Sequence, residues 1–175
     1  MRDRSYYLGM RRQFQPEELR LLIVAESPPE SGLYFYDPSG RPSEPIFTAF
    51  MEQLGVRPET KPAGLMEMQR RGWLLVDATY EQIDKKFKRQ DPNRDAVLVR
   101  DYPILKQDIR HLSRGDEVPI LLIKANVCRV LDQRLVADGF TVLNQGRRIP
   151  LPMNGNQPKF RQTFREILVA ARLLP

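Results

Sequence analysis

A carboxylate that directly follows an apolar run is the clearest candidate for chemistry in this sequence. Glu26 comes after the run 20–25 and is followed by Pro28 and Pro29. Because prolines restrict the backbone, they favour one fixed position for this side chain. A fixed carboxylate at a strand end suits general-base work on a water molecule. The alternative is a loop glutamate that caps a backbone amide.

Aromatic side chains lie close behind this carboxylate, in the run Leu33-Tyr34-Phe35-Tyr36. The surrounding segment 30–45 is rich in glycine and proline, which predicts a long loop, and long loops in compact domains are often functional. Three consecutive aromatic residues in a loop cannot all face one core. We therefore expect at least one to form a stacking surface for a flat ligand. The alternative is a hydrophobic plug that anchors the loop.

A second acid, Asp77, ends the apolar run that begins at Trp73. A buried acid at this position either accepts a hydrogen bond from a ligand or caps the following turn.

The segment Asn154-Gly155-Asn156-Gln157 precedes the last predicted helix, so backbone N–H groups are expected to be free there. Such a turn favours a phosphate or another anion, and it is equally compatible with ordinary helix capping. Lys159 and Arg161 follow in the first helical turn. Positive charge there is unfavourable for the helix dipole but favourable for a bound phosphate.

Several classes of site are excluded by composition. The chain has one cysteine, Cys128, and one histidine, His111, so it has no internal disulfide, cysteine-rich zinc site, iron–sulfur cluster or histidine-pair metal site. A Ser-His-Asp triad is improbable, and we interpret His111 as a residue at a helix end and Cys128 as a core residue. Phosphate-loop and dinucleotide-binding motifs are absent as well, so we predict neither a metal nor a cofactor.

The charge balance favours an anionic partner, or simply good solubility. Lysine and arginine total 28 against 22 aspartate and glutamate, which gives a net charge of +6. The segment 84–94 is polar and basic, and we interpret it as a solvated loop. No apolar run is long enough to span a membrane, and the first residues have no apolar segment of the kind found in secretion signals. We therefore expect a soluble, cytoplasmic protein with no membrane partner.

These candidate residues need a scaffold, and the apolar pattern predicts one. Continuous apolar runs at 20–25, 73–77, 119–123 and 140–143 indicate buried strands, and helical spacing alternates with them at 45–54, 63–71, 97–112, 125–137 and 158–173. The alternation predicts a single domain over 1–175, a three-layer α/β/α fold with a mostly parallel four-stranded sheet. Ligands of such sheets bind beyond the carboxyl ends of the strands, where 26–36, 77–80 and 152–157 should meet.

The order of these motifs resembles the uracil-DNA glycosylase superfamily, from about Leu21 to Leu168. Ile23-Val24-Ala25-Glu26-Ser27-Pro28-Pro29 resembles the first family motif, of the G-E-A-P-G type. The resemblance continues through 32–36, the strand ending at Asp77, the strand 120–124 and a proline-containing loop before the last helix.

The resemblance implies a function in which a base is flipped out of DNA and its glycosidic bond is hydrolysed by water. Glu26 resembles the water-positioning residue, Phe35 the stacking aromatic, and Asp77 falls where many members carry a base-reading asparagine. Asn154 falls in the segment that resembles the second motif, usually H-P-S, and is expected to contact the base. The residues expected to contact DNA phosphates are Ser27, Gly155, Asn156, Lys159 and Arg161.

The second motif departs from the family, because Leu151 stands where the histidine is expected. An ionised Asp77 only accepts hydrogen bonds, whereas an asparagine also donates. These differences favour a divergent member, with Met153 as a candidate wedge that pushes the base out. Two other functions stay open: a non-catalytic module that binds nucleic acid or a nucleotide, and a hydrolase of a small phosphorylated or glycosidic substrate. In the nucleic-acid case, a basic face around the pocket is expected from Lys85, Lys86, Lys88, Arg89, Lys159 and Arg161.

Overall fold

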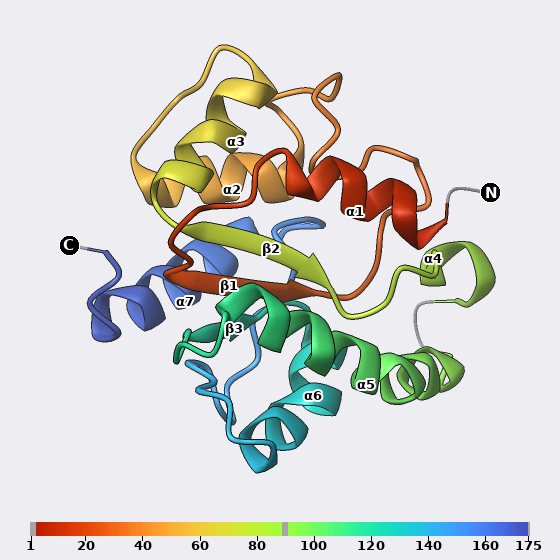
Figure 1. Ribbon diagram of the computed structural model, residues 1–175. Coiled ribbons are helices and arrows are strands. Elements are labelled where there is room, and N and C mark those ends of the chain that lie inside the picture. Colours follow the sequence, from red (N-terminus) through yellow and green to blue (C-terminus); the bar gives the residue numbers. More distant parts are fainter. Residues whose placement is uncertain (1–2, 89–90, 175) are drawn as a thin grey trace.

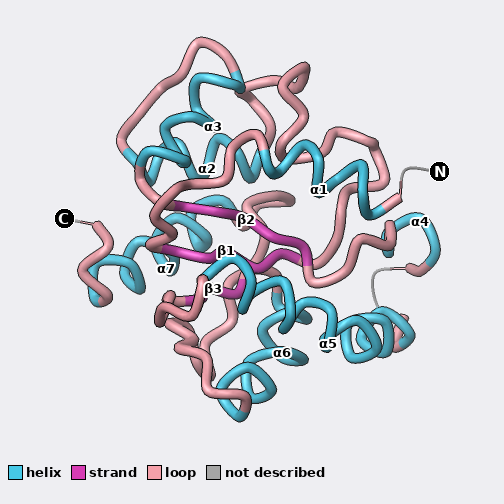
Figure 2. Tube along the Cα trace, viewed as in Figure 1, coloured by secondary structure: helices cyan, strands magenta, loops and turns pink. Residues whose placement is uncertain are grey.

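Three short parallel strands form the centre of the fold, in a computed structural model that describes residues 3–88 and 91–174. The strands are β1 (Leu21–Ala25), β2 (Trp73–Asp77) and β3 (Ile120–Leu122). The order in the sheet is β2-β1-β3, so the first strand of the chain lies in the middle (Figure 2). The predicted mixed α/β class and the parallel sheet are therefore confirmed.

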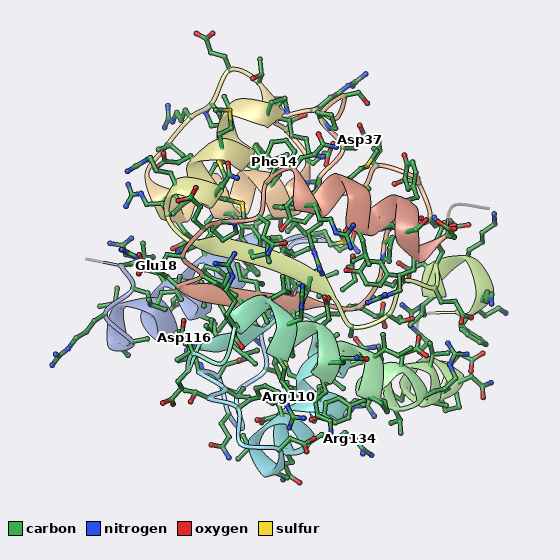
Figure 3. All side chains as sticks on the ribbon, in the orientation of Figure 1. Phe14, Glu18, Asp37, Arg110, Asp116 and Arg134 are labelled. Atoms are coloured by element: carbon green, nitrogen blue, oxygen red, sulfur yellow. The ribbon has the colours of Figure 1, made fainter. Side chains whose placement is uncertain are left out.

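Helices surround these strands on both sides. In Figure 1 the first three helices lie above the strands, and the fifth and sixth lie below them. Every residue of the three strands is buried, which requires cover on both faces of the sheet. Side chains fill the space between helices and strands (Figure 3). The described helices are α1 (Arg4–Arg12), α2 (Pro45–Leu54), α3 (Lys61–Arg70), α4 (Ile83–Lys86), α5 (Asn93–Ser113), α6 (Ala125–Ala137) and α7 (Gln157–Ala170).

Local sequence explains both ends of α2. Pro45 begins α2, where its missing N–H is not needed, and Gly55 ends the helix with a φ of 70° that suits glycine.

Helix α5 is longer than the predicted 97–112 and carries Pro103 in its interior. Apolar side chains on α5, such as Leu98 and Leu105, are buried, and their packing tolerates the hydrogen bond that proline removes. None of the described helices is long and apolar enough to cross a membrane.

The sheet has three strands where four were predicted. The segment 140–143 contributes one parallel bridge, between Val142 and Ile120. The side chain of Asn144 then takes the place of a strand backbone, because its Oδ1 accepts from Leu122 N and its Nδ2 donates to Leu122 O, both at 2.9 Å. A carboxamide offers the same acceptor and donor as a peptide group, so it closes this edge of the sheet.

The other edge of the sheet, along β2, is closed by Tyr36. Its hydroxyl accepts from Leu75 N at 2.7 Å and donates to Leu75 O at 2.9 Å. Tyr36 is buried, so neither backbone group of Leu75 reaches water in the folded chain. This hydroxyl also fixes the loop that carries Tyr34 and Phe35 against the sheet.

Removing the Tyr36 hydroxyl is expected to destabilise the fold with little change in packing. Tyr36→Phe keeps the ring but leaves a buried N–H and a buried C=O of Leu75 without partners, at a cost of about 1–3 kcal/mol each. Unfolding in urea, followed by circular dichroism, measures the loss. Tyr6→Phe is the matched control, since Tyr6 is only partly buried. An unchanged midpoint for Tyr36→Phe contradicts the role assigned to this hydroxyl.

Candidate functional site

The two acids singled out in the sequence lie at the same edge of the sheet. In the register of β1 and β2, Ala25 pairs with Asp77, and Glu26 O accepts from Thr79 N at 3.0 Å just beyond. A cavity of about 240 Å³ opens at this edge and is lined by Glu26, Phe35 and Asp77 together. We call it the central cavity. Three segments that are far apart in the sequence thus meet there.

The loop that brings Phe35 to this cavity is fixed by a buried lysine. Lys61 in α3 is fully buried, and its Nζ donates to Tyr34 O at 2.9 Å and to Glu44 at 2.6 Å. A buried ammonium group requires such partners, because an unpaired charge in the interior is very costly. The ion pair therefore ties both ends of the loop segment 34–44 to α3.

Phe35 is both a core residue and a wall of the cavity. Its side chain is 8% exposed, and its ring centroid lies 5.0 Å from that of Tyr36 and 5.7 Å from that of Phe50. The same residue lines the central cavity together with Tyr34 and Phe47. All three aromatic residues are buried in one core cluster, so the expectation that they cannot all face one core is wrong, and the anchoring plug is confirmed. A stacking role for Phe35 stays a prediction.

Glu26 is 4% exposed and its carboxylate is fully engaged. Oε1 accepts from Arg94 Nε at 3.3 Å and from Asn126 Nδ2, while Oε2 accepts from Arg94 Nη2 at 2.6 Å and from Lys124 Nζ. An ionised carboxylate has about four lone-pair positions, and all four are occupied here. Glu26 can hold a water molecule only if one of these donors leaves. Its catalytic role stays a prediction.

Arg94 corrects the interpretation of the basic segment as a solvated loop. Its side chain is buried, and it donates to Glu26, to Asp84 at 2.5 Å and to Phe87 O at 3.1 Å. The planar guanidinium group has five donors, which lets one side chain bind two carboxylates and a carbonyl at once. Arg94 comes from the start of α5 and therefore joins that helix to the end of β1.

Asp77 is almost fully buried, and its Oδ2 forms no hydrogen bond with any described residue. Burial raises the pKa of Asp77 to about 7; the charge of Glu26 acts in the same direction, while Arg11 and Tyr34 oppose it. Near neutral pH this carboxyl group therefore carries a proton for much of the time. A protonated carboxyl both donates and accepts, unlike the ionised form considered from the sequence.

Lys124 lies two residues beyond the end of β3 and lines the central cavity. Its backbone has a φ of 79°, a left-handed conformation that residues other than glycine rarely adopt. Backbone strain of this kind is common at functional sites. Lys124 also lines a second cavity of about 330 Å³, which we call the adjoining cavity. The two cavities share Asp84, Lys124, Leu151 and Met153.

The other predicted contact residues are divided among separate places. Ser27 lines the central cavity, whereas Asn154 and Asn156 line the adjoining cavity, and Gly155 lies between them in the chain with a left-handed φ of 82°. Asn154 is therefore not brought together with Phe35 and Asp77. Met153 lines both cavities and is only partly buried.

None of the described members of the predicted basic face lines the central or the adjoining cavity. Arg161 pairs with Glu52 at 2.6 Å and lines a different, smaller cavity, while Lys86 pairs with Glu81. Neither of them lines the central or the adjoining cavity, and the same holds for the exposed Lys85, Lys88 and Lys159. Arg89 lies outside the described residues. Cys128 is buried as predicted, and His111 is exposed near the end of α5.

Sequence reasoning missed Arg94, Lys124 and Asn126 as members of the site. Lys124 could have been found, because it follows the predicted strand 119–123 just as Glu26 follows the predicted strand 20–25. Arg94 gave no such signal, since it lies in a run of charges whose other members are mostly exposed. Among the described residues, no group of three or more His, Cys, Asp or Glu side chains is placed to hold a metal ion.

Comparison with known proteins adds no relative: no protein family, curated protein or solved structure matches this chain.

Proposed function

We propose that this chain binds a single nucleobase of a nucleic acid in the central cavity and hydrolyses the bond between that base and its sugar. The observation that carries the proposal is that Glu26, Phe35 and Asp77 line one cavity. The resemblance of the motif order to the uracil-DNA glycosylase superfamily assigns these same three residues to water activation, stacking and base recognition.

The size and walls of the cavity support a flat, single-ring or double-ring ligand. Its volume of about 240 Å³ is below the roughly 300–1,000 Å³ of pockets for drug-sized molecules. Phe35, Tyr34 and Phe47 contribute aromatic walls, and aromatic rings bind bases by stacking regardless of sequence.

Asp77 supplies the polar recognition that an aromatic wall lacks. In its protonated form it presents a donor beside an acceptor, which complements a base edge that carries an acceptor beside a donor. Its unpaired Oδ2 makes recognition favourable, because a ligand donor would satisfy a group that is otherwise buried without a partner.

The chemical step requires one base and one water molecule. The water oxygen attacks the anomeric carbon of the sugar, the bond to the base nitrogen breaks, and the bonding electrons leave with the base. Glu26 takes the proton that the water loses, and the departing base is then protonated from solvent. A positioned general base of this kind contributes typically about 100- to 10,000-fold to the rate.

A second function is favoured by a specific observation, the fully occupied carboxylate of Glu26. If none of its four donors leaves, no water is activated and the chain only binds bases. The site would then be a base-binding module without catalysis.

One experiment separates the two functions. Duplex and single-stranded oligonucleotides that carry a panel of uracil, deaminated, alkylated and mismatched bases are incubated with the protein. Binding is measured by fluorescence anisotropy at several salt concentrations, and base release by alkaline strand cleavage. Release of a base supports the hydrolase. Binding that falls steeply with salt but gives no release supports the binding module. No binding even at low salt contradicts both.

Replacing the aromatic ring of Phe35 is expected to lower the affinity for a base more than it lowers the stability of the fold. Phe35→Leu removes the stacking face but keeps most of the apolar volume, so we expect the binding free energy to fall by up to the roughly 1–3 kcal/mol that stacking contributes. Phe50→Leu is the matched control, since Phe50 contacts Phe35 but does not line the central cavity. Equal losses of affinity in the two variants would assign the effect to the core.

A further inference from the structure

Lys124 lies where the central and adjoining cavities meet, and it is the one cation among the described residues that line either of them. The central cavity is otherwise lined by apolar side chains, small polar side chains and the acids Glu26, Glu44, Asp77 and Asp84. The adjoining cavity is lined by Asn126, Asn154 and Asn156 together with apolar groups and Asp84. The single ammonium group therefore determines where an anionic part of a ligand can be bound.

The backbone holds this lysine firmly at the junction. Its N–H donates to Ile149 O at 2.9 Å, and its carbonyl accepts from Cys128 N at 3.1 Å in the first turn of α6. The side chain is 22% exposed, and its ammonium group contacts Glu26. Because a lysine ammonium group is carried on a flexible four-carbon chain, and Lys124 lines both cavities, rotation of this chain is a route by which Nζ can turn towards the adjoining cavity.

We propose that Lys124 binds a phosphate group of the ligand in the adjoining cavity and that it leaves Glu26 when it does so. This inference rests on the proposed function only for the base in the central cavity. The ligand is then a base attached to a sugar phosphate, with its base in the central cavity and its phosphate beside Lys124, Asn154 and Asn156.

The exchange of partners has a direct effect on Glu26. When Lys124 turns to the phosphate, Oε2 regains one lone pair, which is the position that an attacking water needs. Arg94 stays bound to both oxygens, so the buried carboxylate keeps a counter-ion. Binding of the phosphate is thus coupled to release of the general base.

One acid opposes this site. Asp84 lines both cavities, and its Oδ1 lies 3.9 Å from Lys124 Nζ. It is 47% exposed and already bound by Arg94 at 2.5 Å, which offsets part of its repulsion of a phosphate. Two neighbouring substitutions are therefore expected to change phosphate affinity in opposite directions.

The test measures phosphate binding without any base, so that it does not depend on the proposed function. Inorganic phosphate is titrated into the wild type and the variants, and amide shifts are followed by NMR. Lys124→Met is expected to weaken binding about 10- to 100-fold, because a charge-assisted hydrogen bond is lost. Asp84→Asn is expected to strengthen it severalfold. Lys106→Met, whose lysine pairs with Asp138 and lines neither cavity, is expected to bind like the wild type.

Two further probes identify the source of the phosphate. A deoxynucleoside 5′-monophosphate and a short single-stranded oligonucleotide are compared in the same variants. Dependence on Lys124 for both probes indicates that a terminal phosphate is sufficient for binding, and dependence for the oligonucleotide alone indicates a phosphate of the nucleic-acid backbone. Phosphate affinity that is the same in wild type, Lys124→Met and Asp84→Asn overturns the inference. If Lys124→Met does not fold, the Asp84→Asn result decides.

These outcomes are distinct from failure of the proposed function. Lys124-dependent phosphate binding without base binding leaves this inference standing and removes the base-excision proposal. Base release that is the same in Lys124→Met and in the wild type supports the base-excision proposal and contradicts the inference about Lys124.

Discussion

Glu26→Gln is expected to lower the rate of base release by about 100- to 10,000-fold while the nucleic acid still binds. A carboxamide has the same shape as the carboxylate but cannot take a proton from the attacking water. The measurement is single-turnover release of the base on the best substrate of the panel. An unchanged rate would show that Glu26 is not the general base.

The control for this substitution must account for the two cations that Glu26 neutralises. Removing one member of a buried ion pair typically costs about 3–5 kcal/mol of stability, so part of any loss could come from unfolding. Asp108→Asn is the matched control, because Asp108 binds the buried Arg11 through two hydrogen bonds of 2.6 and 2.9 Å but does not line the central cavity. A loss of rate confined to Glu26→Gln assigns the effect to the chemistry.

Asp77→Asn is expected to stabilise the protein at alkaline pH and to leave its stability at acid pH nearly unchanged. The pKa of Asp77 is raised from its ordinary value of 3.8 to about 7, mainly by burial. The folded chain therefore binds this proton more tightly than the unfolded chain, and the wild type loses stability as pH rises from about 4 to 7. This difference in pKa between the unfolded and folded chain corresponds to about 4 kcal/mol of unfolding free energy. The asparagine variant has no proton to lose here, so its stability does not fall by this amount.

Urea unfolding at pH 4 and at pH 8 measures this effect, with Asp101→Asn as a control that is not expected to gain stability at either pH. Burial raises the pKa of Asp101, but hydrogen bonds from Arg100 and Thr79 lower it more, so the net value lies below the ordinary one. The carboxylate of Asp101 therefore stabilises the fold at pH values above its ordinary pKa of 3.8, and this contribution is lost only as pH falls below that value. A gain for Asp77→Asn that is equal at both pH values would contradict a buried, protonated Asp77.

The same substitution tests base recognition. An asparagine presents a donor and an acceptor at every pH, whereas Asp77 does so only when protonated. Wild-type base binding is therefore expected to weaken as pH rises through about 7, while binding by Asp77→Asn stays constant. If the resemblance to the family is correct, uracil release by the variant should also exceed that of the wild type.

The sequence predicted the parts of this fold that depend on local pattern. Continuous apolar runs located β1 and β2, and the rule that ligands bind beyond the carboxyl ends of parallel strands brought Glu26, Phe35 and Asp77 to one place. The helix 45–54 was predicted with its observed ends because Pro45 and Gly55 mark them.

The parts that depend on contacts between distant residues were not predicted. Arg94 lies 68 residues from Glu26, and a charged run in the sequence resembles a solvated surface whether or not one member is buried. The run 140–143 has the apolar pattern of a strand, yet Asn144 and not a strand backbone pairs with Leu122. Periodicity reports burial, and it does not report which group satisfies a backbone hydrogen bond.

The two side chains that close the sheet have a consequence for association with other chains. A strand edge with free N–H and C=O groups is a template to which a peptide or a second copy can add by β-augmentation, and such edges promote aggregation. On one edge the hydroxyl of Tyr36 binds the N–H and C=O of Leu75. On the other edge the carboxamide of Asn144 binds the N–H and C=O of Leu122. An incoming strand would have to displace a buried side chain at either edge before it could pair. The hydroxyl of Tyr36 on one edge, and the carboxamide of Asn144 together with the bridge at Ile120 on the other, thereby oppose templated growth of the small sheet.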